Sequence, residues 1–317
     1  MSKLIIHQPK NFESRHYRYY NRVFDALIEE IKKEHDVIDN RYFKYANSGW
    51  FPVLLLSQDT FFNDTKIHIL ECEMIIENYD TKGIKVLSVS DDLTSATLDL
   101  QNSQYCNKVL ISQFDRKKIS NHIYNQDNMW KYSPWLYFPQ TVQKYDFYWN
   151  KRRECKSLKD KIYFRGSCLE CRNIILYLNP DLFHGGPPIG GFDMYAEELL
   201  NYKVGLSIAG RGEFCYRDIE YMAMGIPFIR FQYNNEMALE LKPNYHYISV
   251  ERPADMPYDK DCTVEHAKLL EQRFYEVKDD VNFLENIAKN AREYYENYIT
   301  INNCVAHTKK LLELDKW

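Results

Sequence analysis

The sequence has no long hydrophobic run, and no stretch approaches the roughly 20 apolar residues that a membrane helix needs. Residues 1–10 have too short an apolar run before polar residues to form a secretory signal peptide. We therefore expect no transmembrane segment and a cytoplasmic location, which suits a bacterial or viral source.

Neither sign of charge dominates the chain. The formal net charge is −4 over 317 residues, so there is no general basic field. Proteins that bind along a nucleic acid backbone rely on such a field to neutralise phosphates. Nucleic acid is therefore not an expected partner.

Cysteine is present but has no metal-binding or disulfide pattern. In a cytosolic chain of this size, the scattered spacing indicates reduced thiols. Cys168 and Cys171 form one CxxC pair, but no second pair or close His pair completes a tetrahedral zinc shell. We expect no metal site here. The eight cysteines lie at positions 72, 106, 155, 168, 171, 215, 262 and 304.

The length allows two domains, and 45% hydrophobic residues suffice for two cores. In the first half, residues 16–34 have helical spacing of apolar residues, whereas residues 120–153 have no sustained period and are interpreted as a crossing between domains. We place the domains at 1–150 and 151–317. The expected strands of the first half are residues 51–56, 66–76 in part, 84–89 and 108–114.

The second half alternates strands and helices. Strands are expected at 162–164, 204–209, 226–229 and 245–250, with a loop over 179–191 and three closing helices over 264–276, 279–298 and 302–314. This alternation is typical of an α/β fold. We predict two facing doubly wound, Rossmann-like domains with a cleft between them.

A strand, a glycine turn and a helix follow one another in residues 204–225. The turn contains Gly210 and Gly212, where backbone approaches a ligand closely, and the helix begins near Arg217 and ends at Gly225. The first turn of a helix has unpaired N–H groups and a partial positive charge, so this unit predicts an anion-binding site.

A second stretch of the same kind precedes it. Arg165, Gly166 and Ser167 follow the strand at 162–164, and Arg172 comes five residues later. Arginine is a permanently charged, forked donor that suits phosphate groups. Structural alternatives remain open at this stage: Arg217 pairing with Glu213 or Glu220, Arg165 supporting its strand, and Arg172 covering a helix face.

These residues together resemble glycosyltransferase family 90, the family of protein O-glucosyltransferases and capsule-associated xylosyltransferases. The similarity covers roughly residues 84–315, and its most specific piece is the run from Leu241 to Ile248. It includes Phe164-Arg165-Gly166-Ser167, Arg172, Arg217, Tyr137-Phe138-Pro139 and Leu241-Lys242-Pro243-Asn244-Tyr245-His246-Tyr247-Ile248.

The resemblance implies a GT-B fold and inverting transfer of a sugar, usually glucose or xylose, from a UDP-sugar to a hydroxyl of a glycan or protein. The resemblance implies that Arg165, Ser167, Arg172 and Arg217 surround the donor nucleotide and its diphosphate, and we add Gly166, Gly210, Gly212 and Phe214 of the same two segments as candidate donor-binding residues. The implied catalytic base is Asp91, which ends the segment 86–91, with Asp92 as its fallback. The alternative for Asp91 is a helix-capping or turn residue.

We expect no metal and no cofactor beyond the UDP-sugar. Asp259-Lys260-Asp261 has the DxD form, but it lies in a polar loop, and the arginines already supply positive charge. Two other classes stay open. One is a non-catalytic module that binds nucleotide sugars or glycans, and the other is a retaining GT-B transferase.

Overall fold

The computed structural model describes residues 2–7, 25–39, 43–44, 53–54, 74–79, 81, 84–88, 107–112, 114–116, 127, 130, 132–135, 144–167, 170–210, 212–234, 236–254, 256 and 262–317. The chain forms two compact units. Unit 1 contains Met1–Thr141, Asn235–Leu239 and Tyr298–Trp317, and unit 2 contains Val142–Asn234 and Glu240–Asn297.

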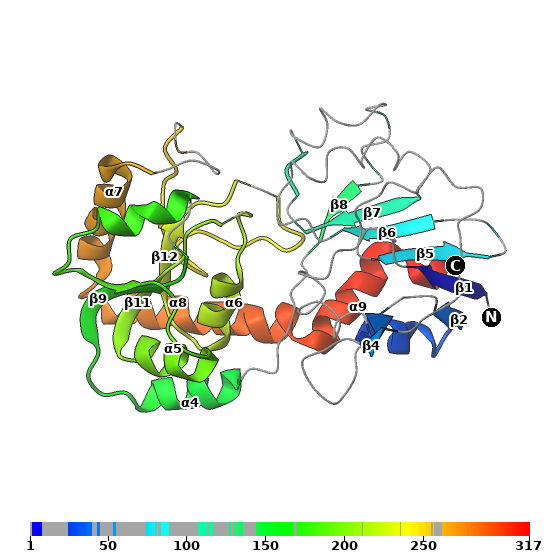
Figure 1. Cartoon of the computed structure of the whole chain (residues 1–317), viewed down its shortest axis with the longest axis horizontal. Coiled ribbons are helices and arrows are strands. Elements are labelled where there is room, and N and C mark those ends of the chain that lie inside the picture. The colour runs from blue at the N-terminus through cyan, green and yellow to red at the C-terminus, as the bar shows by residue number, and fades with distance from the viewer. Residues whose placement is uncertain are drawn as a thin grey trace. The chain divides into compact units, whose positions relative to one another are not determined.

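Unit 2 is built on a five-stranded sheet in the order β10-β9-β11-β12-β13, and all of its pairings are parallel (Figure 1). Its central strands are near-continuous apolar runs, as expected for a parallel sheet that is buried on both faces. The strands are β9 (Lys159–Arg165), β10 (Phe183–Gly186), β11 (Tyr202–Leu206), β12 (Phe228–Phe231) and β13 (Ile248–Val250).

Helices cover both faces of this sheet. Ile162 and Phe164 of β9 lie in one buried core with the 3₁₀ helix η3 (Glu170–Leu176) and with α7 (Val264–Val277). Tyr163 points the other way and donates from Oη to Glu198 of α5 (Phe192–Leu199) at 2.8 Å. Alternate residues of a strand face opposite sides, so this one strand separates two covered layers.

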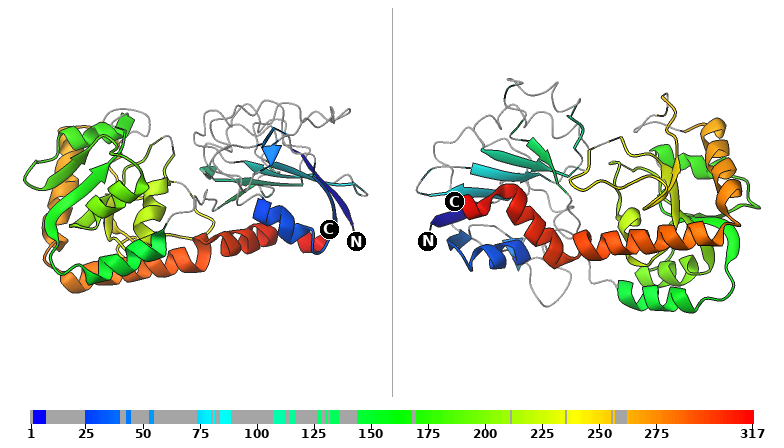
Figure 2. Two further views of the ribbon diagram at one scale, coloured as in Figure 1. Left: turned by 60° about the horizontal axis from the view of Figure 1, so that its bottom comes forward. Right: turned by 180° about the vertical axis from the view of Figure 1, so that it is seen from behind.

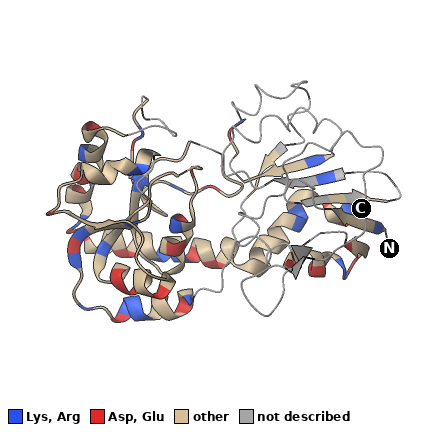
Figure 3. Ribbon diagram, in the orientation of Figure 1, with Lys and Arg blue, Asp and Glu red and all other residues tan. Residues whose placement is uncertain are grey.

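The remaining helices of unit 2 are α4 (Tyr145–Glu154), α6 (Tyr216–Ala223) and α8 (Val281–Tyr294). Figure 2 shows α8 beside α4, where Arg292 of α8 pairs with Asp146 at 2.5 Å. Lysines, arginines and acidic residues are interspersed over these helices (Figure 3). The predicted α/β, Rossmann-like fold class is confirmed by this layered unit.

The strand order decides where a ligand is expected. In chain order the strands of the sheet stand 2-1-3-4-5, so the order reverses between β9 and β11. Ligands of open α/β sheets bind at the carboxyl ends of the strands beside such a reversal, because the connections leave on opposite faces there. The residues that follow β9 and β11 therefore lie at the expected binding edge.

Unit 1 contains a six-stranded sheet in the order β2-β1-β5-β6-β7-β8 and a small antiparallel pair, β3 with β4. The large sheet is mixed, because β5 pairs antiparallel with both β1 and β6. The strands are β1 (Lys3–His7), β2 (Asp36–Asp39), β3 (Phe43–Lys44), β4 (Val53–Leu54), β5 (Met74–Asn78), β6 (Ile84–Ser88), β7 (Lys108–Ile111) and β8 (Tyr132–Pro134).

The sheet of unit 1 has one antiparallel strand, β5, within the predicted α/β architecture. Only residues 79–83 connect β5 to β6, too few for the crossover that a parallel pair needs. The backbone N–H of Thr81 donates to Asn78 Oδ1 at 3.0 Å and tightens this connection. Strands β5 and β6 therefore form an antiparallel hairpin.

The last helix, α9 (Ile301–Leu312), belongs to unit 1 and not to the sheet that precedes it in sequence. Its Cys304, Val305 and Leu312 share a buried core with the helical residues 25–31 and with β1. Figure 2 shows α9 beside the helix of residues 25–31. Trp135 donates from Nε1 to Thr308 at 2.9 Å. The predicted closing helices are all present, but the third packs in the first unit.

Several elements lie where the sequence pattern indicated none. Strand β8 and all but the last residue of helix α4 lie within residues 120–153, which were interpreted as a crossing, and β10 lies within the loop expected at 179–191. In the described part of the chain, no helix combines the length and hydropathy needed to cross a bilayer. No disulfide joins two of the described cysteines, which lie at positions 155, 171, 215, 262 and 304.

Candidate functional site

The strand–turn–helix predicted from the glycines is present in unit 2. Strand β11 ends at Leu206, and α6 starts at Tyr216 with Cys215 as its N-cap. The intervening glycine turn, residues 210–215 with Arg211 outside the described residues, is closed by a bond from Gly210 N to Gly212 O at 3.1 Å. Gly225 follows α6 with φ +60°, which stops the helix as predicted.

The N-terminus of α6 is occupied by its own chain. The backbone N–H of Cys215 donates to Asp218 Oδ2 at 2.7 Å, and Asp218 is fully buried. A carboxylate at this position already satisfies the positive end of the helix. Any anion held at this edge therefore depends on arginine side chains more than the sequence pattern implied.

Arg217 of α6 reaches across to the end of β9. Its guanidinium lies over the ring of Phe164 at 4.3 Å, and Nη2 donates to the backbone oxygen of Arg165. A Cβ on Gly166 would lie 2.7 Å from that Nη2, so glycine is required for this approach. The Arg217 Nε is buried without a hydrogen-bond partner among the described residues.

Neither carboxylate considered for Arg217 pairs with it. Glu213 binds Arg230 and Arg252 instead, and no ion pair joins Arg217 to Glu220 among the described residues. The half-buried guanidinium of Arg217 thus forms no ion pair among the described residues, although the charge of Glu220 acts on it at longer range.

Arg172 repeats this arrangement at the second glycine. It comes from η3, after β9, and its Nη2 would lie 2.5 Å from a Cβ placed on Gly210. The same Nη2 contacts Cys215 Sγ at 3.7 Å, and Nε is buried with no hydrogen-bond partner in the described part of the chain. Two arginines therefore lie over two glycines, at the carboxyl ends of neighbouring strands.

Arg165 differs from these two arginines. Its Nε and Nη2 donate to both oxygens of Glu198, at 2.8 and 2.7 Å. Tyr163 Oη and His184 Nε2 contact the same carboxylate at 2.8 and 2.9 Å. The bonds from Arg165 lower the pKa of Glu198 to about 2, so both partners stay charged. These contacts tie the end of β9 to α5, which is the structural role considered for Arg165 as an alternative to phosphate binding.

The other predicted donor residues lie around the same edge. Gly166 is buried and bonds through its N–H to Gly186 O at 3.0 Å, whereas Ser167 is exposed. Gly212 lies in the glycine turn. Phe214 is buried and packs edge-on against Tyr233, with 5.7 Å between the ring centroids, so it anchors the turn in the core.

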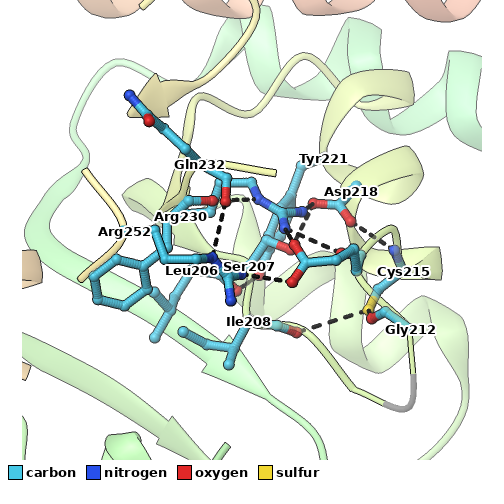
Figure 4. A network of polar contacts seen from close by, with 12 residues as sticks. Leu206, Ser207, Ile208, Gly212, Cys215, Asp218, Tyr221, Arg230, Gln232 and Arg252 are labelled. Atoms are coloured by element: carbon cyan, nitrogen blue, oxygen red, sulfur yellow. Dashed lines mark hydrogen bonds and ion pairs between the residues drawn. The ribbon is translucent and has the colours of Figure 1, made fainter. Parts of the chain in front are cut away.

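Sequence reasoning missed a cluster of buried charges behind the glycine turn, which we call the charge network (Figure 4). Asp218 Oδ1 accepts from Ser207 Oγ at 2.6 Å and from Arg230 Nη1 at 2.8 Å. Arg230 lies in β12, 1% exposed, with its guanidinium 3.4 Å from the centroid of the Tyr233 ring. The members are Glu213, Asp218, Arg230 and Arg252.

One signal for this network was present in the sequence. Arg230 interrupts the apolar run Ile226-Pro227-Phe228-Ile229-Arg230-Phe231, which forms a strand buried on both faces. A charge in such a strand has to meet an opposite charge, because burying it alone is very costly. Its two carboxylate partners lie on the segment that precedes the strand, and spacing alone does not identify them.

The most specific piece of the family resemblance folds as a turn that leads into β13. Asn244 has φ +55°, and its Oδ1 accepts from the backbone N–H of Ser249 at 3.1 Å. His246 is buried, and its Nδ1 accepts the backbone N–H of Lys242 at 2.9 Å. In these contacts the run from Leu241 to Ile248 is a structural element of unit 2.

Burial of His246 predicts a pH-dependent stability. Burial, with the nearby charge of Lys242, lowers the pKa of His246 from its ordinary 6.5 to about 4. Between these values the unfolded chain binds a proton that the folded chain does not, so stability is complete above pH 6.5 and declines toward pH 4. We expect the free energy of unfolding, measured in urea, to fall by about 2 kcal/mol between pH 7 and pH 4.5 through this group.

The control for this prediction is His246→Asn, whose Oδ1 takes the place of the accepting nitrogen but does not titrate. The difference in stability between wild type and variant is expected to shrink as the pH falls from 7 to 4.5. A difference that stays constant over this range would show that His246 titrates equally in both states.

Some predicted residues cannot be placed. Asp91, its fallback Asp92, the Asp259–Asp261 motif and Cys168 lie outside the described residues. Within the described ranges, no three His, Cys, Asp or Glu side chains gather as a metal site would require. The absence of a metal therefore stays an expectation.

No protein-family model matches the sequence, and no curated protein matches it. Solved structures similar to the chain include HepE of Anabaena in complex with UDP (TM-score 0.46, 11% identity, 72% of each chain). Others are a glycosyltransferase of Rickettsia africae (0.44, 14%, 71% of this chain and 70% of that chain) and sucrose-phosphate synthase of Thermosynechococcus elongatus (0.45, 12%, 70% and 61%). At such low identity the residues of the site, not the neighbours, have to indicate the function.

Proposed function

We propose that the chain is an inverting glycosyltransferase that moves a sugar from a UDP-sugar to an acceptor hydroxyl. The observation that carries the proposal is the pair Arg172 and Arg217. Both lie over glycines at the carboxyl ends of β9 and β11, and both have a buried Nε without a partner among the described residues. Buried donors are normally satisfied, so two orphaned cationic donors at a binding edge indicate an anionic ligand.

The chemistry of a leaving diphosphate suits this pair. When the bond between the anomeric carbon and the β-phosphate oxygen breaks, negative charge builds up on the diphosphate. Cations held in place before the reaction stabilise that charge more than they stabilise the bound substrate. Arg165 is paired with Glu198, so we assign it the weaker share of this role.

The identity of the donor rests on the resemblance to glycosyltransferase family 90. We propose UDP as the nucleotide, glucose or xylose as the sugar, and a glycan or protein hydroxyl as the acceptor. The two arginines supply the positive charge that a metal supplies in other transferases, so we propose a reaction without a metal ion. The UDP complex of HepE suggests UDP as the first ligand to test.

Inversion needs one base on the acceptor side. In the proposed step, the Asp91 carboxylate takes the proton of the acceptor hydroxyl while the oxygen of that hydroxyl bonds to the anomeric carbon. The bond to the diphosphate breaks at the same time, and UDP leaves with the electron pair. Configuration at the anomeric carbon is inverted because attack and departure occur on opposite faces.

The test begins with binding. We expect UDP, UDP-glucose or UDP-xylose to raise the melting temperature of the protein, because a ligand that binds only the folded state stabilises it. Released UDP then reports turnover, and proton NMR of the product reports its anomeric configuration. Failure of every nucleoside diphosphate sugar to bind would overturn the proposal, and retained configuration would replace inversion with a retaining mechanism.

Asp91→Asn separates the catalytic role from binding in the same assays. We expect transfer to fall by about 10²–10⁴-fold while UDP binding is kept, since an amide accepts no proton at neutral pH. Asp92→Asn is the matched control. Unchanged transfer in Asp91→Asn would remove this residue from the mechanism, and transfer lost only in Asp92→Asn would move the role by one position.

A further inference from the structure

The charge network ties three strand ends to the glycine turn. Arg252, which follows β13, donates from Nη2 to Glu213 Oε1 at 2.6 Å and from Nε to the backbone oxygen of Gln232 at 3.1 Å. Gln232 follows β12, and Glu213 lies in the glycine turn that follows β11. Figure 4 shows Arg252 approaching this cluster from the side opposite Asp218.

Glu213 is the only acidic side chain of the described turn residues, and it is 3% exposed. Its Oε2 lies 3.2 Å from Arg230 Nη2, and its backbone oxygen accepts from the same nitrogen at 3.0 Å. The turn also contains the bonds from Gly210 N and Cys215 Sγ to Gly212 O. Besides these internal bonds, the turn is therefore held through Glu213 by Arg230 of β12 and by Arg252, which follows β13.

We infer that Arg252 is a positioning residue of the donor site, acting through Glu213 on the glycine turn. The inference rests on the proposed function for its effect on UDP, but not for its effect on the turn. The turn carries Gly210 and Cys215, on which Arg172 rests, and it leads directly into Arg217. A shift of the turn thus moves both orphaned arginines.

Arg252 is a better probe than Arg230. The Arg230 side chain contacts both acids of the network, Glu213 and Asp218, so its removal disturbs the whole cluster. Arg252 forms an ion pair with Glu213 but not with Asp218. Arg252→Met removes the charge and keeps the length of the side chain. Arg252→Lys keeps the charge but loses the forked geometry.

Arg152 provides a matched control. It is 9% exposed, like the side chain of Arg252, and it bonds to the backbone oxygens of Leu200 and Tyr202 at 2.7 and 2.8 Å. Tyr202 begins β11, so these bonds lie at the end of the strand away from the glycine turn. Arg152→Met removes a buried arginine of the same unit without touching the proposed site.

The first measurement needs no nucleotide. Cys215 caps α6 within the turn, and its alkylation rate, read by peptide mass spectrometry, reports whether the turn is held. We expect the rate to rise by about tenfold in Arg252→Met, less in Arg252→Lys, and not at all in Arg152→Met. Cys155 serves as the internal reference in the two Arg252 variants.

The second measurement is the dissociation constant of UDP by calorimetry. We expect UDP to bind about tenfold more weakly to Arg252→Met, because small displacements of positioning groups are costly, and Arg252→Lys to lie between it and wild type. Binding to Arg152→Met is expected to stay unchanged, which separates positioning from a general loss of stability.

Each outcome of the two measurements either supports or overturns the inference on Arg252. An unchanged Cys215 rate in Arg252→Met overturns the inference, and so does unchanged UDP affinity when wild type binds UDP. If wild type binds no UDP although the alkylation rate of Cys215 rises in Arg252→Met, the proposed function fails, but the inference that Arg252 holds the glycine turn is supported. If Arg252→Met does not fold, Glu213→Gln and Arg252→Lys are measured with the same expected directions.

Discussion

Replacing Arg217 by alanine is expected to lower kcat for sugar transfer by about 10²–10³-fold, the loss typical of removing one preorganised donor to developing charge. The guanidinium is held over Phe164 and bonded to the backbone of β9, so it is already in place before the reaction. Steady-state rates with saturating UDP-sugar measure this loss. We expect KM to change less, because the charge develops on the leaving group.

The control is Arg153→Ala, which removes an exposed arginine of α4 whose guanidinium lies 5.6 Å from the Trp149 ring. It is expected to leave kcat within about twofold of wild type. Gly166→Ala tests the same site from the other partner, because its Cβ would displace Nη2 of Arg217. A loss below threefold in Arg217→Ala would place the diphosphate elsewhere.

Arg230→Met is expected to lower the free energy of unfolding by about 3–5 kcal/mol, the cost of leaving a buried charge without its partner. The side chain compensates Asp218, which is fully buried, and shares Glu213 with Arg252. Without it the network has two carboxylates for one arginine. Urea unfolding at pH 7, followed by circular dichroism, measures the loss.

A charge-balanced double variant is the control for this result. Arg230→Met with Asp218→Asn leaves one arginine and one glutamate, and we expect it to recover part of the stability lost in the single variant. Lys144→Ala breaks an exposed pair with Asp193, and its cost is expected to stay within about 1 kcal/mol. A cost of that size for Arg230→Met would mean that the network contributes little to stability.

The arginines illustrate how far local pattern reaches. The glycine turn, the start of α6 and its end at Gly225 follow from signals within a few residues, because turns and helix ends depend on local backbone chemistry. The partner of Arg165 does not follow from any such local signal. Glu198 lies 33 residues further along the chain, and only the packing of α5 on β9 brings the two side chains together.

The pairing considered for Arg217 shows the same limit. Glu213 and Glu220 both lie close to it in sequence, and spacing offered no reason to prefer either or neither. In the folded unit Arg230 and Arg252 take Glu213, because both reach it from the ends of neighbouring strands. Contacts that involve other residues thus leave Arg217 without an ion pair among the described residues.

By itself, the sequence determined the alternation of strands and helices, the glycine turn and the closing helices, since these depend on periodicity and on residues near one another. Tertiary structure alone decided the reversal between β9 and β11, the antiparallel β5 in unit 1, the place of α9 and the partners of every buried charge. The physical reason is that strand pairing and ion pairing join residues far apart in the chain. Their free energy depends on which faces meet, and no local pattern encodes that.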